Sequence, residues 1–231
     1  MKRSLINRLI RDAEKFIRER GFYMPPFAFW TPQDWARKGL EADEIRRAML
    51  GWDITDYGSK DFFKTGLIHF TLRNGSASDA QINRRYAEKI LIIHEGQVLP
   101  WHFHHKKTED IINRGGGILG MELAWASEDG NSFADREVTV SMDGVKRTFK
   151  SCGKVELSAG ESITIPHHLY HTFYGKSGHG PILVGEVSTV NDDKSDNHFL
   201  KPAVRFVEIE EDEPVYRYLS NEYPKAQRRL G

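Results

Sequence analysis

The first twenty residues carry hydrophobic side chains at spacings of three and four, as on one face of an amphipathic helix. Gly21 follows at the place where a helix C-terminal cap is expected, and Pro25 and Pro26 prevent the helix from continuing. The pattern therefore predicts one N-terminal helix ending near residue 20. Its apolar face is formed by Leu5, Ile6, Leu9, Ile10, Ala13, Phe16 and Ile17.

A second, short helix is expected from Thr31. Pro32 suits its first helical position, and Asp34 lies in its first turn. The helical pattern continues, with a break at Gly39, through residues 43–50. The first part of the chain is thus predicted to be largely helical.

Beyond residue 60 the pattern changes to short runs of branched and aromatic residues separated by turn residues. Asp143 and Gly144 lie between two of these runs and form a strong two-residue hairpin signal. Many short strands at close spacing indicate an antiparallel sandwich or barrel. The runs are 66–72, 88–94, 118–126, 137–142, 145–149, 154–157, 162–165, 171–174, 182–188 and 204–209.

The predicted fold class is therefore mainly β. Residues 1–60 are expected to form a helical extension in which Gly51 ends the last helix and 53–60 is a loop. Residues 61–231 are expected to form an antiparallel β-barrel on which the extension packs, giving one structural domain overall. A length of 231 residues and a hydrophobic fraction of 39% suit a single domain with a sizeable core.

Charge and cysteine content narrow the classes of function. The formal net charge is zero, so neither a nucleic-acid nor a membrane partner is expected, since such proteins usually carry a basic face. The single cysteine, Cys152, excludes an intramolecular disulfide. The N-terminus is too charged for a signal peptide, and no apolar run approaches the roughly 18 residues of a membrane span. We expect a cytoplasmic protein.

Histidines and one glutamate form the main candidate site. His102 and His104 are two residues apart on an expected strand, so they project from the same face. Glu109 follows a short turn, at a distance that allows the chain to come back and add a carboxylate. A second stretch, residues 160–175, offers a fourth ligand, His171, from a distant hairpin. Together these side chains can hold a divalent cation.

The two stretches resemble the two motifs of the cupin superfamily, whose fold is a jelly-roll β-barrel. The first motif is matched at every position, by Gly96, His102, His104, Glu109 and Gly116. This resemblance implies a metal site made by the three histidines and the glutamate.

The second cupin motif is matched by Gly160, Pro166 and His171, and the sequence departs from it at two positions. His168 replaces a glycine and Gly175 replaces an asparagine, which affects the shape of the turn but keeps the fourth ligand. A ligand set of nitrogen and oxygen without thiolate suits one Mn²⁺, Fe²⁺, Co²⁺, Ni²⁺ or Zn²⁺ ion.

A narrower resemblance covers most of the chain. Segments 51–58, 70–75, 109–117 and 185–193 are similar to those of the D-lyxose isomerase family. This resemblance implies an isomerase that interconverts D-lyxose with D-xylulose, and often D-mannose with D-fructose, typically with Mn²⁺.

Two side chains are candidates for the proton transfer that such a reaction needs. Glu186 lies on an expected strand, on the same face as Ile182 and Val184, so it would point into the barrel and act as the general base. An exposed edge glutamate is the alternative. Lys107 lies between His104 and Glu109 and could polarise a sugar oxygen; the resemblance favours this role over that of a solvated lysine. Transfer through a cis-enediol fits a single cation better than a hydride shift.

Further residues are candidates for contacts with the sugar. Asp193 and Asp196 lie in a polar loop after Glu186 and could bind hydroxyl groups at the barrel mouth. Trp30, Phe27 and Trp101 could form an apolar wall, although aromatic side chains are more often core residues. His168 could face the pocket or the solvent. Four other histidines are expected to be ordinary half-buried residues: His69, His94, His179 and His198.

Two other functions remain open at this point. An Fe²⁺-dependent cupin dioxygenase could use the same four ligands, and a non-catalytic sugar-binding cupin would bind a ligand without turning it over. A homodimer is expected by analogy with other cupins.

Overall fold

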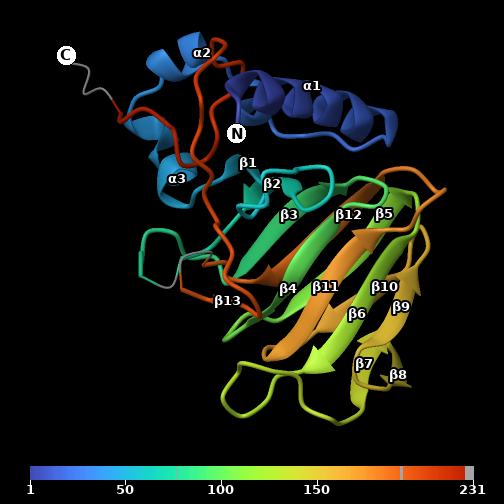
Figure 1. The fold of residues 1–231 in the computed structure, drawn as a ribbon. Helices are drawn as coiled ribbons and strands as arrows, with labels where there is room; N and C mark the ends of the chain where they lie inside the picture. Colours follow the sequence, from blue (N-terminus) through green and yellow to red (C-terminus); the bar gives the residue numbers. More distant parts are fainter. Residues whose placement is uncertain (77, 193–194, 227–231) are drawn as a thin grey trace.

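The computed structural model describes residues 1–76, 78–192 and 195–226, and it consists of two facing antiparallel sheets with a helical layer on one of them (Figure 1). The fold class predicted from the sequence is confirmed. The larger sheet has the order β1 (Gly51–Thr55), β2 (Leu67–Arg73), β3 (Tyr86–Ile93), β12 (Ile182–Thr189), β5 (Glu109–Gly116), β10 (Ser162–Ile165), β7 (Val138–Met142) and β8 (Val145–Phe149). The smaller sheet has the order β13 (Asn197–Phe199), β4 (Val98–His104), β11 (Leu169–Gly175), β6 (Leu119–Trp125) and β9 (Gly153–Leu157).

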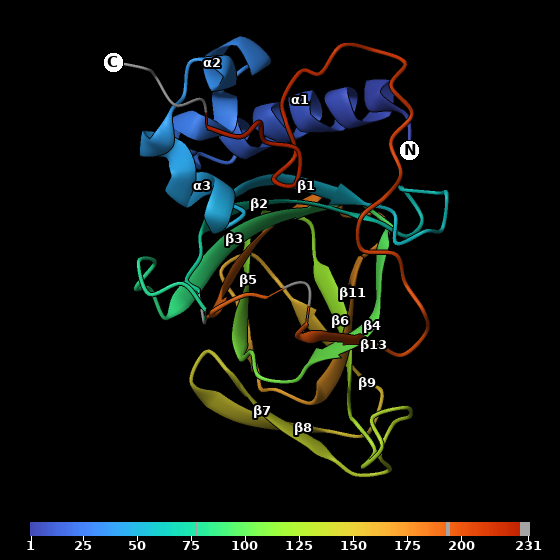
Figure 2. The ribbon, with the colours of Figure 1, turned by 90° about the vertical axis from the view of Figure 1, so that its left-hand side faces the viewer.

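The main core lies between the two sheets, which curve around it as Figure 2 shows. Successive side chains of a strand point to opposite faces, so each strand of the larger sheet contributes to two environments. On β2, Leu67 belongs to the inner core, whereas Ile68 and Phe70 belong to a second core beneath the helical layer. Both faces of β2 and β3 are largely buried, so hydrophobic residues occur on both faces of these strands, as in the run Ile90–Ile93 of β3.

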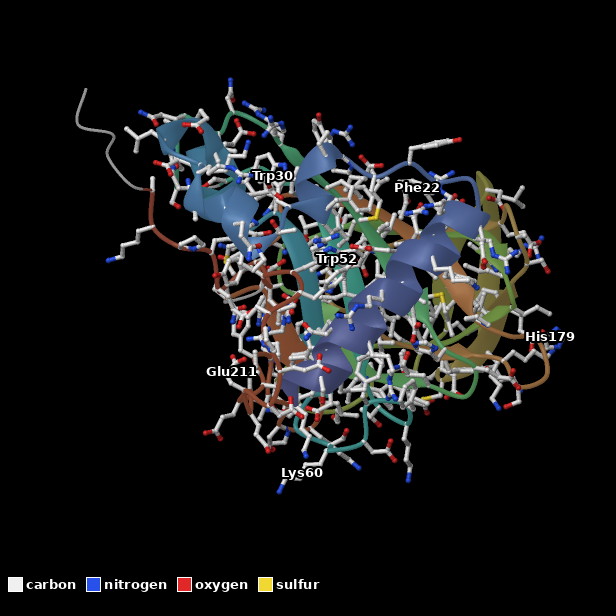
Figure 3. All side chains as sticks on the ribbon, turned by 90° about the horizontal axis from the view of Figure 1, so that it is seen from above. Phe22, Trp30, Trp52, Lys60, His179 and Glu211 are labelled. Atoms are coloured by element: carbon white, nitrogen blue, oxygen red, sulfur yellow. The ribbon has the colours of Figure 1, made fainter. Side chains whose placement is uncertain are left out.

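The helical layer contains α1 (Arg3–Glu19), and Figure 3 shows this helix lying across the larger sheet above Trp52. The expected apolar face of α1 packs on Trp52 and Phe70. The helix ends in a Schellman motif, in which Gly21 adopts a φ of 69° and the N–H of Phe22 donates to the carbonyl of Ile17. No helix in the described residues is both long and apolar enough to cross a membrane.

The second helix begins as the sequence predicts. Thr31 and Asp34 form a capping box, with Pro32 at the first helical position. The last helix ends earlier than expected, at Arg47 and not at Leu50. The short helices of this layer are the 3₁₀ helix η1 (Pro26–Phe29), α2 (Pro32–Ala36), the 3₁₀ helix η2 (Leu40–Ala42) and α3 (Asp43–Arg47).

One strand replaces part of an expected loop. Gly51–Thr55 forms β1, the edge strand of the larger sheet, paired with β2 from Gly51 opposite Thr71 to Thr55 opposite Leu67. The prediction that residues 53–60 are entirely a loop is therefore wrong. Trp52 and Ile54 are buried beneath α1, and this burial outweighs the weak local signal.

The expected strand at residues 204–209 is absent. Here the chain leaves β13, crosses the edge of the larger sheet and returns to α1 (Figure 1). Its backbone bonds to separate partners: the N–H of Val204 donates to Tyr57 and the N–H of Glu210 donates to Met1. The segment lies beside β1, where Thr55 Oγ1 donates to the carbonyl of Val204, but it forms no strand. We call residues 200–226 the C-terminal segment.

Two turns illustrate how local sequence sets backbone shape. Asp143 and Gly144 have φ values of 49° and 81° and join β7 to β8, which confirms the predicted hairpin. His168 has a φ of 61°, in the left-handed region that favours glycine, so the second cupin motif keeps its turn although the usual glycine is missing.

Candidate active site

Three histidine side chains converge inside the barrel. His102 and His104 project from β4, and His171 lies directly opposite His102 on β11. One ring nitrogen from each histidine lies within 4.8 Å of the others. The strand positions that we inferred from the His-x-His spacing are therefore correct.

Backbone carbonyls orient two of these rings. Nδ1 of His102 lies 2.8 Å from the carbonyl oxygen of Pro100, and Nδ1 of His171 lies 2.9 Å from that of Leu169. With the proton on Nδ1, each ring keeps a lone pair on Nε2. Metal-bound histidines are commonly held by such a hydrogen bond.

Some nitrogens of this cluster have no hydrogen-bond partner among the described residues. They are Nε2 of His171 and both ring nitrogens of His104, and all are buried. Buried polar atoms without partners are costly, and a cation that accepts their lone pairs removes that cost. Burial lowers the pKa of His102 well below its ordinary value, and His171 and His104 lower it further. The neutral imidazole that a metal needs is thus favoured.

Glu109 completes the group from the first position of β5. Its Oε1 lies 3.2 Å from Nε2 of His171 and its Oε2 lies 3.5 Å from Nε2 of His104. Burial alone would raise the pKa of this carboxyl group, but Lys107 and His104 hold it well below its ordinary value. Three imidazoles and one carboxylate therefore fit a divalent cation of the Mn²⁺ to Zn²⁺ series.

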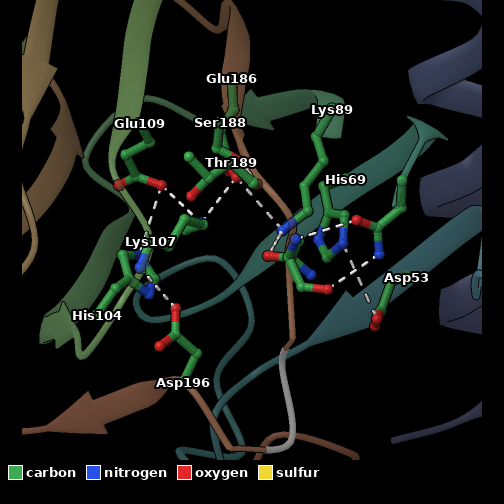
Figure 4. A network of polar contacts seen from close by, with 12 residues as sticks. Asp53, His69, Lys89, His104, Lys107, Glu109, Glu186, Ser188, Thr189 and Asp196 are labelled. Atoms are coloured by element: carbon green, nitrogen blue, oxygen red, sulfur yellow. Dashed lines mark hydrogen bonds and ion pairs between the residues drawn. The ribbon is translucent and has the colours of Figure 1, made fainter. Parts of the chain in front are cut away.

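Lys107 links this group to a second carboxylate, as Figure 4 shows. Its Nζ lies 2.6 Å from Oε2 of Glu109 and 2.8 Å from Oε1 of Glu186. Burial opposes the charged ammonium, but the two carboxylates raise the pKa of Lys107 above its ordinary value. The lysine is therefore a cation shared by the two acids.

Glu186 points into the barrel from β12, as its strand position predicts, and only 6% of it is exposed. Burial would raise its pKa, but Lys107 and Lys89 lower it, and Nζ of Lys89 lies 3.4 Å from Oε1. The carboxylate is thus ionised. One cavity is lined by Glu186 together with His102, His104, Lys107 and Glu109, so a base and a possible metal site face the same space.

Comparisons with known proteins agree with this geometry. A family model described as D-lyxose isomerase matches residues 1–223. The chain belongs to the D-lyxose isomerase family. It is 46% identical over 224 residues to a D-lyxose/D-mannose isomerase of Escherichia coli O157:H7, covering 96% of this chain and 98% of that protein. It is 45% identical over 225 residues to a D-lyxose/D-mannose isomerase of Serratia proteamaculans, with the same coverage.

More distant solved structures share the fold of this D-lyxose isomerase family member. An L-ribose isomerase variant of Acinetobacter sp. DL28, in complex with L-ribose, superposes with a TM-score of 0.58 at 15% identity, covering 91% of this chain and 98% of that chain. The ligand-free L-ribose isomerase of Cellulomonas parahominis gives a TM-score of 0.53 at 15% identity, and the match covers 87% of this chain and 93% of that chain. The protein is thus an isomerase built on a barrel that other sugar isomerases also use.

Several side chains that we expected at the sugar lie elsewhere in this isomerase. Phe27 packs on Phe70 and Trp30, on the helical side of the larger sheet, whereas the cavity lies on the opposite side. Their placement does not support the expected apolar wall. Trp101 packs on Phe133 outside the cavity. His168 is exposed in the turn before β11 and is not among the residues that line the cavity in the described part of the chain.

The two candidate aspartates differ from each other. Asp193 lies outside the described residues. Asp196 is buried, and its carboxylate accepts the backbone N–H groups of Lys106 (2.8 Å) and Lys107 (3.0 Å). It therefore shapes the loop that carries Lys107, and it is not among the residues that line the cavity in the described part of the chain.

The structure also brings in residues that the sequence analysis did not assign to the site. His69, expected to be an ordinary half-buried residue, is only 4% exposed and lines the cavity. Lys89 and Arg205 line it as well. Strand alternation could have indicated that His69 faces the barrel interior, because His69 shares a face of β2 with Leu67 and Thr71. Nothing local indicated Arg205, which reaches the cavity from the C-terminal segment.

Proposed function

We propose that this enzyme interconverts D-lyxose with D-xylulose and D-mannose with D-fructose, by proton transfer through a cis-enediol. The names of the two bacterial relatives support this substrate class. The observation that carries the mechanism is the position of Glu186, a buried ionised carboxylate in the cavity that His102 and His104 also line. A base beside a possible metal site is what an aldose–ketose isomerisation requires.

We further propose that His102, His104, Glu109 and His171 hold one divalent cation, with Mn²⁺ as the native ion. The unpartnered nitrogens of His104 and His171 support a bound cation. When bound, such a cation supplies Lewis acidity for the oxygens on C1 and C2 of the open-chain sugar.

Glu186 carries the proton between the two carbons. Its carboxylate takes the proton from C2, and the electron pair of that bond forms the C1–C2 double bond of the enediol. The same proton then passes from Glu186 to C1, while the proton of the O2 hydroxyl moves to O1 and the electron pair of the O2–H bond forms the C2 carbonyl. Because the group that receives the proton also returns it, one carboxylate on one face of the sugar is sufficient.

Lys107 keeps Glu186 ionised and oriented. Its ammonium contacts both Glu186 and Glu109, so it fixes the base relative to the proposed metal ligands. The positive charge also favours the negative charge that develops on the sugar oxygens, in a site that excludes most water. Association into a homodimer stays a prediction.

An isomerisation assay tests the proposal. Metal-stripped protein resupplied with Mn²⁺ is given D-lyxose or D-mannose, and the ketose is measured. We expect ketose from both sugars, loss on chelation, and a loss of about 10²–10⁴-fold in kcat for Glu186→Gln. Glu156→Gln, an exposed glutamate on β9 paired with Lys176, is the matched control and should keep full activity. Absence of ketose with every metal would refute the function.

Isotope exchange tests the route. In D₂O, the enediol mechanism predicts that the product ketose gains solvent deuterium at C1, because the proton on Glu186 can exchange before it returns. Complete retention of the substrate's C2 hydrogen would instead support a hydride shift.

A further inference from the structure

A polar cluster lies at the end of the cavity away from the three imidazoles. The larger sheet has the order β5, β12, β3, β2, so His69 on β2 is two strands from Glu186 and three from Glu109. Neighbouring strands are about 4.8 Å apart. Figure 4 shows His69 and Asp53 on the opposite side of Glu186 and Lys89 from Glu109.

The cluster is held together by an ion pair from the C-terminal segment. Asp53 on β1 lies opposite His69 in the strand register, with Oδ2 3.9 Å from Nε2 of His69. The guanidinium of Arg205 donates hydrogen bonds to the same carboxylate, from Nη1 to Oδ1 at 3.1 Å and from Nη2 to Oδ2 at 2.7 Å. Such two-point pairs fix geometry as well as charge.

The chemistry of this end of the cavity suits a chain of hydroxyl groups. His69 and Asp53 are 4% and 6% exposed, and the same inner face carries Leu67 and Leu91 as well as the polar side chains Thr71 and Lys89. A buried imidazole and a guanidinium–carboxylate pair offer both donors and acceptors, and a hydroxyl group can pair with either.

We propose that His69 determines how this enzyme recognises the length of the sugar chain, by binding the C6 hydroxymethyl group of a hexose. The inference rests on the proposed function, which places C1 and C2 beside Glu186 and the imidazoles. The carbon chain then crosses β3 towards β2. A pentose has one carbon fewer and ends short of His69. Asp53 is a positioning residue, since it acts on the sugar through His69, whereas Arg205 both holds Asp53 and lines the cavity itself.

A second observation supports a role in measuring length. His69 also lines a separate, outer cavity together with Asp53, Thr71, Asn74 and Asn191. The imidazole therefore stands between the inner cavity and this outer one. A sugar that extends from Glu186 meets His69 before it could reach the outer cavity.

Binding of open-chain polyols tests the proposal without turnover. Calorimetry on the Mn²⁺-loaded full-length protein compares D-mannitol, the reduced form of mannose, with D-arabinitol, the reduced form of lyxose. His69→Leu removes both ring nitrogens and matches the neighbouring Leu67 and Leu91. We expect mannitol affinity to fall about tenfold and arabinitol affinity to change less than about twofold. The control His94→Leu, at the end of β3 and outside the inner cavity, should leave both unchanged.

Equal losses for the two polyols, or no loss, would overturn the proposal. If His69→Leu does not fold, Arg205→Met supplies the test, because it removes the guanidinium that holds Asp53 beside His69 and that lines the inner cavity. It should lower mannitol affinity selectively, by about threefold, and Arg205→Lys should restore part of it. A purely structural role would give no such selective rescue.

Turnover separates this inference from the proposed function. If wild-type protein converts both sugars and His69→Leu keeps the ratio of kcat/KM for mannose over lyxose, the inference fails and the function stands. The opposite outcome is that the wild-type protein converts neither sugar, while His69→Leu binds mannitol more weakly than the wild-type protein does and binds arabinitol equally well. In that case the function fails and the inference stands.

Discussion

Nζ of Lys107 lies 2.8 Å from Oε1 of Glu186, although the two residues are 79 positions apart in the chain. The first comes from the loop between β4 and β5 and the second from β12. Both side chains are buried, so the barrel holds an opposite pair of charges at a fixed place beside the proposed metal ligands. The pair is therefore sensitive to any change in either strand or in the loop.

Replacement of Lys107 by methionine should damage both activity and stability. Glu109 and Glu186 would lose their shared cation, which leaves two buried carboxylates close together. We expect kcat to fall by about 10²–10⁴-fold and the metal-free protein to lose roughly 3–5 kcal/mol of unfolding free energy. Steady-state kinetics and urea unfolding measure the two effects. Lys106→Met, at the exposed neighbouring position, should change neither.

Replacement of Asp196 by alanine separates loop shaping from sugar binding. The backbone N–H groups of Lys106 and Lys107 would lose their acceptor, so Lys107 would be less well positioned. We expect kcat to fall about 10–100-fold with KM nearly unchanged, and Asp196→Asn to retain part of the activity. A rise in KM with an unchanged kcat would show instead that Asp196 contacts the sugar.

Addition of Mn²⁺ to metal-stripped protein should raise its melting temperature. A ligand at one hundred times its Kd stabilises the folded state by about 2.7 kcal/mol. For a chain of 231 residues this corresponds to a shift of roughly 5–11 °C. Differential scanning calorimetry measures the shift, which His104→Leu should abolish. His179→Ala, an exposed histidine in the loop before β12, should retain it. An undiminished shift in His104→Leu would place the ion elsewhere.

Replacement of Arg3 by leucine should loosen the C-terminal segment. The side chain of Arg3 is 1% exposed and bonds to Glu211 and Glu222, which ties this segment to α1. Charge-assisted hydrogen bonds of this kind contribute about 2 kcal/mol, and we expect a loss of that order in urea unfolding. The exposed pair of Lys2 and Glu210 offers a control, since Lys2→Ala should cost less than about 0.5 kcal/mol.

Local sequence was sufficient for the elements whose signals act over a few residues. The apolar spacing of α1, the capping box of Thr31 and Asp34, and the Asp143–Gly144 hairpin all formed where they were predicted. These features depend on contacts within one turn or one hairpin, so the residues that decide them are adjacent in the chain. Strand alternation is also a local signal, and it correctly predicted that His102 and His104 project from the same face of β4.

The two cupin motifs also indicated all four proposed metal ligands, because the motif spacing reflects strand lengths that the barrel imposes, and strand alternation indicated that Glu186 points into the barrel. The strand β1 was missed, and the strand expected at residues 204–209 was wrong, for the opposite reason. Trp52 forms part of a strand because α1 covers it, and residues 204–209 form no strand because they meet β1 through single contacts, such as that of Thr55 Oγ1 with the carbonyl of Val204. Neither the burial of Trp52 nor the surroundings of residues 204–209 can be inferred from the neighbouring residues in the sequence.

Tertiary structure alone decided the composition of the cavity beyond the motif. Phe27 and Trp30 are separated from it by a sheet, whereas Asp53, His69 and Arg205 meet beside it from β1, β2 and the C-terminal segment. The sequence determined which side chains could do chemistry and which face of a strand they would occupy. Which distant side chains share a cavity depends on how sheets curve and where connections return, and those are set by the burial of the whole core.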